Sequence, residues 1–210
     1  MKNFIANLSP SKAAMVVGIA FITSVIIVTL IDDFLLANFV VPGDSEALAN
    51  DIEANWRLFV FAVVGYLLVL ALDSIIGLAL YVVLKPANKN LASLTAILRL
   101  LYACTLVIGL FCLVFQIIDV YGYASIKLFG YIFFALHIFV LGYSVFKSGY
   151  IPKSLGILLV VASFTYIVFF VDLNLAETLQ VIIMLTMLVA ELSLSIWLIV
   201  KRNSLPENRL

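Results

Sequence analysis

The sequence predicts an all-α protein: a six-helix transmembrane bundle with both termini cytoplasmic. Hydrophobic residues make up 65% of the 210 residues and charged residues only 11%. A soluble domain of this length cannot bury that much apolar surface, so lipid must be part of the solvent. Six apolar segments are each near or above the ~20 residues needed to cross a bilayer, and the basic residues gather on one side of them.

The six spans are expected within one integral membrane domain, residues 1–210. Their approximate bounds are 13–40, 56–84, 91–118, 126–146, 154–171 and 175–200. The first apolar run is too long for a signal peptide and ends in Asp32 and Asp33, so we interpret it as a span. Residues 41–55 are the only sizeable outer loop. Asp44 or Ser45 has the side-chain oxygen needed to cap a surface helix there.

Charge sorting predicts the orientation. With both termini inside, only Arg57 and Lys127 of the twelve basic residues fall on the outer side. The inner residues are Lys2, Lys12, Lys85, Lys89, Arg99, Lys147, Lys153, Lys201, Arg202 and Arg209. Cytoplasmic loops carry this excess of Lys and Arg, so we expect a multipass protein of a bacterial-type inner (plasma) membrane.

The expected partners follow from the same composition. The net charge is zero and no long basic patch exists, which argues against nucleic acid and leaves the lipid bilayer as the main partner. A small ligand or ion, a homo-oligomer and a membrane partner all stay open. No cofactor signature is evident, because nothing resembles a phosphate loop or a dinucleotide fingerprint.

Three ionisable residues lie at nearly the same depth in the apolar segments. Asp73 lies twelve residues before Lys85, and His137 and Glu191 each lie ten residues before the lysine of their own flank. At about 1.5 Å per helical residue this is roughly 15–18 Å, close to the middle of the bilayer. Ionisable groups at that depth are expensive and usually mark a site or a pairing that holds a bundle together.

Polar and small residues extend these positions into helical stripes that should face the bundle interior. The stripes are Tyr66, Asp73, Gly77 and Tyr81 in the second span, Gly130, His137 and Ser144 in the fourth, and Gln180, Met184, Met187, Glu191 and Ser195 in the sixth. Tyr66, Tyr102, Ser144 and Ser195 are the supporting polar candidates. His137 is expected to pair with one of the two carboxylates.

Arg99 is the fourth member of the predicted polar cluster. It lies about nine residues into the third span, in reach of the other three. The alternative is an interfacial anchor, because its long side chain leans back toward the cytoplasm and can snorkel there. Short acidic side chains cannot snorkel so far, so Asp73 and Glu191 must find partners within the bundle.

Three functions are compatible with these residues. The first is coupling or movement of a proton, ion or small solute through Asp73, Arg99, His137 and Glu191. The second is a membrane-embedded enzyme acting on a lipophilic substrate, with a metal held by His137, Asp73 and Glu191. The third is a structural or partner-binding protein whose cluster specifies packing only.

The enzyme hypothesis is the least favoured of the three. His137 is the only histidine, and no helix carries a local metal-binding pairing such as Glu-x-x-His. The chain also lacks a large domain outside the membrane, which leaves little besides the bundle interior to carry chemistry. No catalytic residue is therefore assigned.

Two turns carry a resemblance. Leu-Tyr-Val-Val-Leu-Lys-Pro ends at Pro86, and Lys-Ser-Gly-Tyr-Ile-Pro ends at Pro152. They resemble a bacterial and archaeal family of multipass membrane proteins known as a domain of unknown function. Its pattern falls on Asp73, Arg99, His137, Gly142, Tyr143, Gly149, Tyr150, Pro152 and Glu191. Over roughly residues 50–200 the resemblance implies a six-span bundle, and it brings no activity, substrate or cofactor.

Overall fold

The computed structural model describes residues 8–31, 52–115, 117–118, 120–170 and 176–206. The helices are α2 (Pro10–Thr29), α4 (Trp56–Leu84), α5 (Lys89–Val114), α6 (Val120–Ser148), α7 (Lys153–Phe170) and α8 (Glu177–Lys201), and a short 3-10 turn, η3 (Arg202–Ser204), follows. No strand occurs among these residues. The prediction of an all-α fold is confirmed for this part of the chain.

Five of the helices are long and apolar enough to cross a membrane, as in a multipass membrane protein: α2, α4, α5, α6 and α8. The apolar part of α7 is shorter, covering Lys153–Val168. The six-span count therefore stays a prediction, although α7 packs beside α6 and α8 like the other members of the bundle.

The helix bounds differ from the expected spans at several ends. α4 covers the same residues as the second span, whereas α6 begins six residues before the fourth. α5 starts two residues early because the side chain of Asn88 caps it, accepting from the amides of Asn90 and Leu91 at 3.0 Å. Residues 32–51 lie outside the described part, and with them the end of the first span, most of the 41–55 loop and its suggested capped helix.

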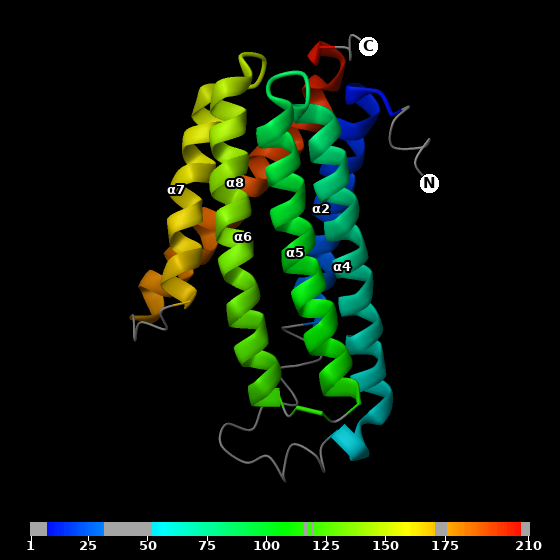
Figure 1. The fold of residues 1–210 in the computed structure, drawn as a ribbon. Helices are drawn as coiled ribbons and strands as arrows, with labels where there is room; N and C mark the ends of the chain where they lie inside the picture. The colour runs from blue at the N-terminus through cyan, green and yellow to red at the C-terminus, as the bar shows by residue number, and fades with distance from the viewer. Residues whose placement is uncertain (1–7, 32–51, 116, 119, 171–175, 207–210) are drawn as a thin grey trace.

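The six helices form a closed ring in chain order. Each helix packs against its neighbours in sequence, and α8 returns to α2 to complete the ring. Successive helices run in opposite directions, so the start of α2 and the end of α8 lie side by side at the top of Figure 1. A hydrogen bond from Ser11 to Asn203 of 3.1 Å joins these two ends.

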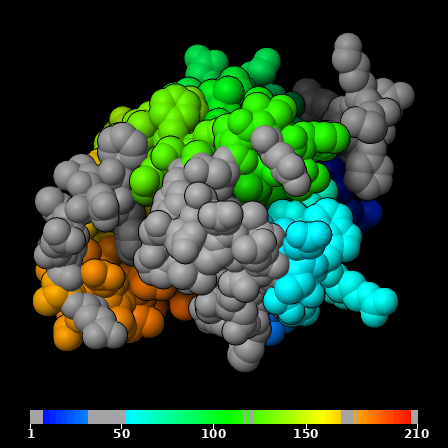
Figure 2. All heavy atoms as spheres, turned by 90° about the horizontal axis from the view of Figure 1, so that it is seen from below, coloured from blue at the N-terminus to red at the C-terminus, as the bar shows by residue number. Residues whose placement is uncertain are grey.

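One end of the bundle carries most of the described basic side chains, and we call it the basic end. It holds Lys12, Lys85, Lys89, Lys147, Lys153, Lys201 and Arg202. Arg57 and Lys127 belong to the opposite end. Figure 2 shows this end from below, with the start of α4 in cyan on one side and the orange part of the α7–α8 pair on the other.

In the hairpin between α6 and α7 the backbones of the two helices approach closely. A Cβ built on Gly142 would lie 2.8 Å from the carbonyl oxygen of Gly156, and one on Gly156 would lie 2.7 Å from that of Gly142. The turn itself places Gly149 at a φ of +78°, a conformation that glycine adopts without steric penalty. The Tyr150 hydroxyl then donates to the carbonyl of Val83 at 2.7 Å, which ties the turn to α4.

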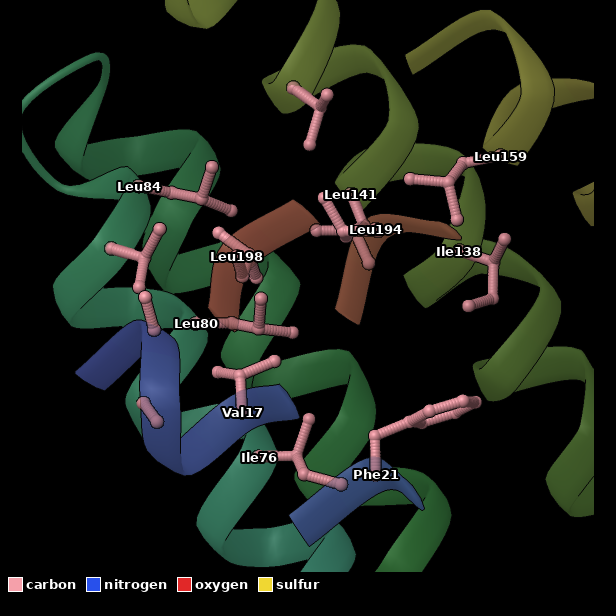
Figure 3. Close-up of a cluster of buried hydrophobic side chains, with 14 of the residues drawn as sticks. Val17, Phe21, Ile76, Leu80, Leu84, Ile138, Leu141, Leu159, Leu194 and Leu198 are labelled. Carbon is pink, nitrogen blue, oxygen red and sulfur yellow. The ribbon is translucent and has the colours of Figure 1, made fainter. Parts of the chain in front are cut away.

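The basic half of the bundle is filled by aliphatic side chains. Figure 3 shows side chains from α2, α4, α6, α7 and α8 meeting there. Its labelled members are Val17, Phe21, Ile76, Leu80, Leu84, Ile138, Leu141, Leu159, Leu194 and Leu198, and all are buried. The cavity of the bundle lies beside this packed core, farther from the basic end.

Helix α8 crosses the bundle obliquely. It runs from the lower end of α7 to the upper end of α2 in Figure 1. In the basic half it lies against α2, where a Cβ built on Gly18 would come within 2.8 Å of the Ser195 carbonyl oxygen. Toward its start the helix stands away from the core, since Val181, Ile182 and Leu185 are about half exposed.

Candidate functional site

A cavity of about 480 Å³ lies inside the ring, and residues of all six helices line it. Its polar end consists of Asp73, Arg99, Tyr102, Tyr166 and Glu191, and the remaining walls are mainly apolar. The walls come from the second half of α2, the first half of α8, and single residues of α4 and α6. The packed core of Figure 3 closes the basic half of the bundle next to it.

Arg99 lies at the centre of the polar cluster and is only 2% exposed. Its Nε donates to Oδ1 of Asp73 at 3.1 Å, and its Nη2 pairs with the same oxygen. Its Nη1 lies 3.1 Å from Nε2 of His137. One guanidinium therefore joins α4, α5 and α6. Charge-assisted bonds of this kind are the stronger ones in proteins, and more so where water is excluded.

The two partners of His137 define its tautomer. Nδ1 lies 2.8 Å from the carbonyl oxygen of Thr95, which can only accept, so Nδ1 carries the proton and donates. Nε2 faces Nη1 of Arg99, which can only donate, so Nε2 is the acceptor. This pair of bonds requires a neutral imidazole. His137 is fully buried, and both of its nitrogens are used in holding Arg99 and Thr95.

Glu191 is the less completely paired of the two carboxylates. Its Oε1 accepts a hydrogen bond of 2.7 Å from the Tyr166 hydroxyl of α7. Its Oε2 lies 4.0 Å from Nη1 of Arg99, at the limit of an ion pair. Asp73, by contrast, receives two direct donors from Arg99. When it is ionised, Glu191 therefore faces the cavity with a charge that Arg99 neutralises only in part.

Aromatic rings surround the charged groups. The Arg99 guanidinium carbon lies 5.2 Å from the centre of the Phe134 ring, within cation–π range. The Phe134 ring lies 4.7 Å from that of Tyr102 and 4.9 Å from that of Tyr166. Three aromatic rings therefore lie at the polar end of the cavity, and that of Phe134 already contacts the Arg99 cation.

The four residues predicted to form the cluster, Asp73, Arg99, His137 and Glu191, are brought together. Of the supporting candidates, only Tyr102 lines the cavity. Tyr66 is buried nearer the opposite end, where Lys127 Nζ lies 5.8 Å from its ring centre. Ser144 donates to the Val140 carbonyl of its own helix at 2.7 Å. Ser195 is buried nearer the basic end than the cluster, beside Gly18.

Two expectations are corrected, and one alternative is excluded. His137 does not pair with a carboxylate, because its Nε2 is already bonded to Arg99. Arg99 does not snorkel toward the cytoplasm, since its side chain is buried against Asp73. The stripe on the sixth span is buried only in its second half, although Met184 of its first half also lines the cavity. Gln180 and Met184 are exposed because the start of α8 stands away from the bundle.

Sequence reasoning missed Thr95, Phe134 and Tyr166. Tyr166 follows Lys153 by thirteen residues, so its hydroxyl falls at the depth that marked Asp73, His137 and Glu191. The same depth measurement, extended from ionisable groups to tyrosines, would have found it. Thr95 acts through its backbone carbonyl and Phe134 through its ring face, and neither contribution leaves a signal in the residue type.

Metal coordination does not fit the geometry of the cluster. No group of three or more His, Cys, Asp or Glu side chains among the described residues is placed to hold a metal ion. Binding through His137 would require Nε2 to release Arg99, or Nδ1 to release Thr95. The guanidinium of Arg99 lies between Asp73, His137 and Glu191, where a metal ion bound by these three residues would have to be.

A protein relative and a family profile both match this chain. A relative from the archaeon Archaeoglobus fulgidus, an uncharacterized protein, is 40% identical over 114 residues, which cover 54% of this chain and 68% of the relative. No solved structure matches. The profile of the family described as domain of unknown function DUF4386 matches residues 16–118 and 114–201. The resemblance predicted from the two turns is confirmed: the chain belongs to this family.

Proposed function

We propose that this membrane protein exchanges a proton for a small solute at Glu191, inside the cavity between its six described helices. The observation that carries the proposal is an imbalance of charge. Among the described residues lining the cavity, two carboxylates, Asp73 and Glu191, face one guanidinium, Arg99. His137 does not correct the imbalance, because its two hydrogen bonds require the neutral ring.

A buried carboxylate without a full counter-charge is costly in the apolar centre of a bundle. Two events relieve that cost: Glu191 takes a proton, or a positively charged group enters the cavity beside it. The two events exclude each other, because each neutralises the same charge. Competition of this kind couples the movement of a solute to that of a proton.

The groups around Glu191 come from several helices. Tyr166 of α7 donates to it, and Arg99 and Tyr102 of α5 and Asp73 of α4 share its cavity. His137 of α6 reaches it only through Arg99. The described cavity residues of α2 are uncharged: Phe21, Ser24, Val25, Val28 and Thr29. Glu191 is therefore the group whose charge can change while the Asp73–Arg99–His137 link stays intact.

The same proposal includes the orientation. We place the basic end in the cytoplasm of a bacterial-type cell, with both termini inside, because the described basic side chains gather there and cytoplasmic segments carry such an excess. The cavity then lies in the outer half of the bilayer. Reporter fusions to the two termini test this placement, and an external terminus would contradict it.

Proton exchange at Glu191 can be tested by infrared difference spectroscopy of the purified protein as the pH is changed. A protonated carboxylic acid in an apolar site has a carbonyl band well separated from that of a carboxylate. We expect a band that disappears as the pH rises, is absent in Glu191→Gln, and is unchanged in Glu53→Gln, which alters an exposed carboxylate outside the cavity. A spectrum that Glu191→Gln leaves unchanged would contradict the proposal.

A further inference from the structure

We propose that the solute taken by the cavity is a hydrophobic monovalent cation, such as an amine or quaternary ammonium compound, which enters from the lipid between the ends of α2 and α8 distant from the basic end. This inference rests on the proposed function, since it identifies the solute that competes with the proton at Glu191. It follows from the charge, the wall chemistry and the exposure of the cavity, argued in turn below.

The charge of the cavity selects against anions. Arg99 is the only cationic group among its described lining residues, and three of its N–H donors are already directed to Asp73 and His137. An anion entering the site would meet the partly neutralised carboxylate of Glu191. A monovalent cation instead supplies the missing charge, and a divalent one would reverse the imbalance rather than remove it.

The walls require the cation to have an apolar body. Phe134, Tyr102 and Tyr166 line the cavity together with Glu191, and aromatic rings attract organic cations, most strongly where water is excluded. Farther from the cluster, Met184 and Met187 are unbranched, polarizable side chains that adapt to ligands of different shape. A strongly hydrated ion would gain nothing from these walls, and a cavity of about 480 Å³ is much larger than such an ion needs.

The position of the opening indicates entry from the lipid. α2 and α8 are in close contact at Gly18 and Ser195, but farther from the basic end they separate, and the cavity lies between them. Met184, Leu185 and Leu188 line the cavity and are also 58%, 52% and 36% exposed. Among the described residues, the cavity therefore reaches the outer surface of the bundle beside α8. The exposed side chains around this opening are apolar. A hydrophobic solute dissolved in the bilayer reaches it more readily than a polar one.

A pair of probes of nearly equal size and shape tests the charge preference. Tetraphenylphosphonium is the cation and tetraphenylborate the matched anion, each titrated into the protein in the same nonionic micelles. We expect saturable binding of the cation and none of the anion. In Glu191→Gln the affinity for the cation should fall about tenfold or more, because an opposite charge in a medium of low dielectric constant is lost. Glu191→Asp, which keeps the charge, should retain binding.

Matched tryptophan substitutions test the entry route. Leu185 and Ile182 lie three residues apart on α8 and are similarly exposed, at 52% and 54%, but only Leu185 lines the cavity. Leu185→Trp should slow or weaken binding of tetraphenylphosphonium, whereas Ile182→Trp should leave it unchanged. Equal effects of the two substitutions would overturn the route between α2 and α8.

The outcomes separate this inference from the proposed function. Binding of the anion in preference to the cation, or cation binding that survives in Glu191→Gln, overturns the hydrophobic-cation inference. If the infrared band of Glu191 still responds to pH in that case, proton exchange stands and the solute is of another class. If the band does not respond while the cation binds, the coupling is wrong and the cavity is a binding site only.

Discussion

Arg99 and His137 lie on neighbouring helices, and Nη1 of Arg99 donates to Nε2 of His137 across 3.1 Å. His137 in turn donates from Nδ1 to the carbonyl of Thr95, on the same helix as Arg99. A neutral histidine therefore bridges the guanidinium and the backbone of α5. This relationship makes His137 a holder of Arg99 rather than an acid or base of the site.

Removal of the imidazole should weaken the bundle without abolishing cation binding. His137→Ala leaves a donor of the buried guanidinium without its acceptor, which costs about 1–3 kcal/mol in the free energy of unfolding. Ser144→Ala on the same helix is the control, since its hydroxyl bonds only to the preceding turn. Unfolding in mixed micelles measures both. A His137→Ala protein as stable as Ser144→Ala would contradict the bridging role.

The two carboxylates should differ in their contribution to stability. Asp73→Asn removes the direct partner of a buried guanidinium, and breaking a buried pair in this way costs about 3–5 kcal/mol. Glu191→Gln should cost less, because its oxygen is 4.0 Å from Arg99 and the Tyr166 hydroxyl can still donate to the amide oxygen. The same unfolding measurement ranks them. The reverse order would show that Glu191, not Asp73, balances Arg99.

The contact between α6 and α7 should not tolerate a methyl group. Gly142→Ala and Gly156→Ala each place a Cβ within 2.8 Å of backbone, so the helices must move apart, at about 1–3 kcal/mol each. Gly77→Ala is the matched control, since its nearest neighbour would be Arg99 Cβ at 3.4 Å, an ordinary contact. Alanine scanning followed by thermal denaturation checks this. Equal losses at all three glycines would contradict the close approach.

Tyr150, in the turn between α6 and α7, should make the stability of the protein depend on pH in the alkaline range. Burial raises the pKa of its hydroxyl to about 12 from the usual 10. The folded protein thus favours the neutral form, so this contribution to stability is present below pH 10 and is lost as the pH rises through about 12. Tyr150→Phe should remove that part of the alkaline loss, together with the bond to Val83. An unchanged alkaline profile in the variant would contradict it.

Depth along the helices could be predicted from the sequence, whereas rotation about them could not. Counting from the basic flanks placed Asp73, His137 and Glu191 at one level, and the structure joins them there through Arg99. Which pairs form depends on the rotation of each helix about its own axis, so the sequence pairs His137 with a carboxylate, whereas its partner in the structure is Arg99. Strongly apolar helices have weak polar stripes, and rotation is set by packing instead.

The tilt of α8 could not be predicted from the sequence, for a different reason. Its stripe of Gln180, Met184, Met187, Glu191 and Ser195 is continuous, which predicts one buried face along the whole helix. The helix is instead tilted, so its second half is packed against α2 while its first half leaves a cavity. Tilt depends on close contacts such as Gly18 against Ser195, and these are properties of a pair of helices.

The central claim is that a proton and a hydrophobic cation compete for Glu191, and counting protons during binding tests it most directly. Tetraphenylphosphonium is added to the protein in weakly buffered micelles, at a pH where the infrared spectrum shows Glu191 protonated, and the released acid is measured. The account predicts close to one proton released per cation bound, weaker cation binding as the pH falls, and no release in Glu191→Gln. Saturable cation binding without proton release, or equal release from Glu191→Gln, would contradict it.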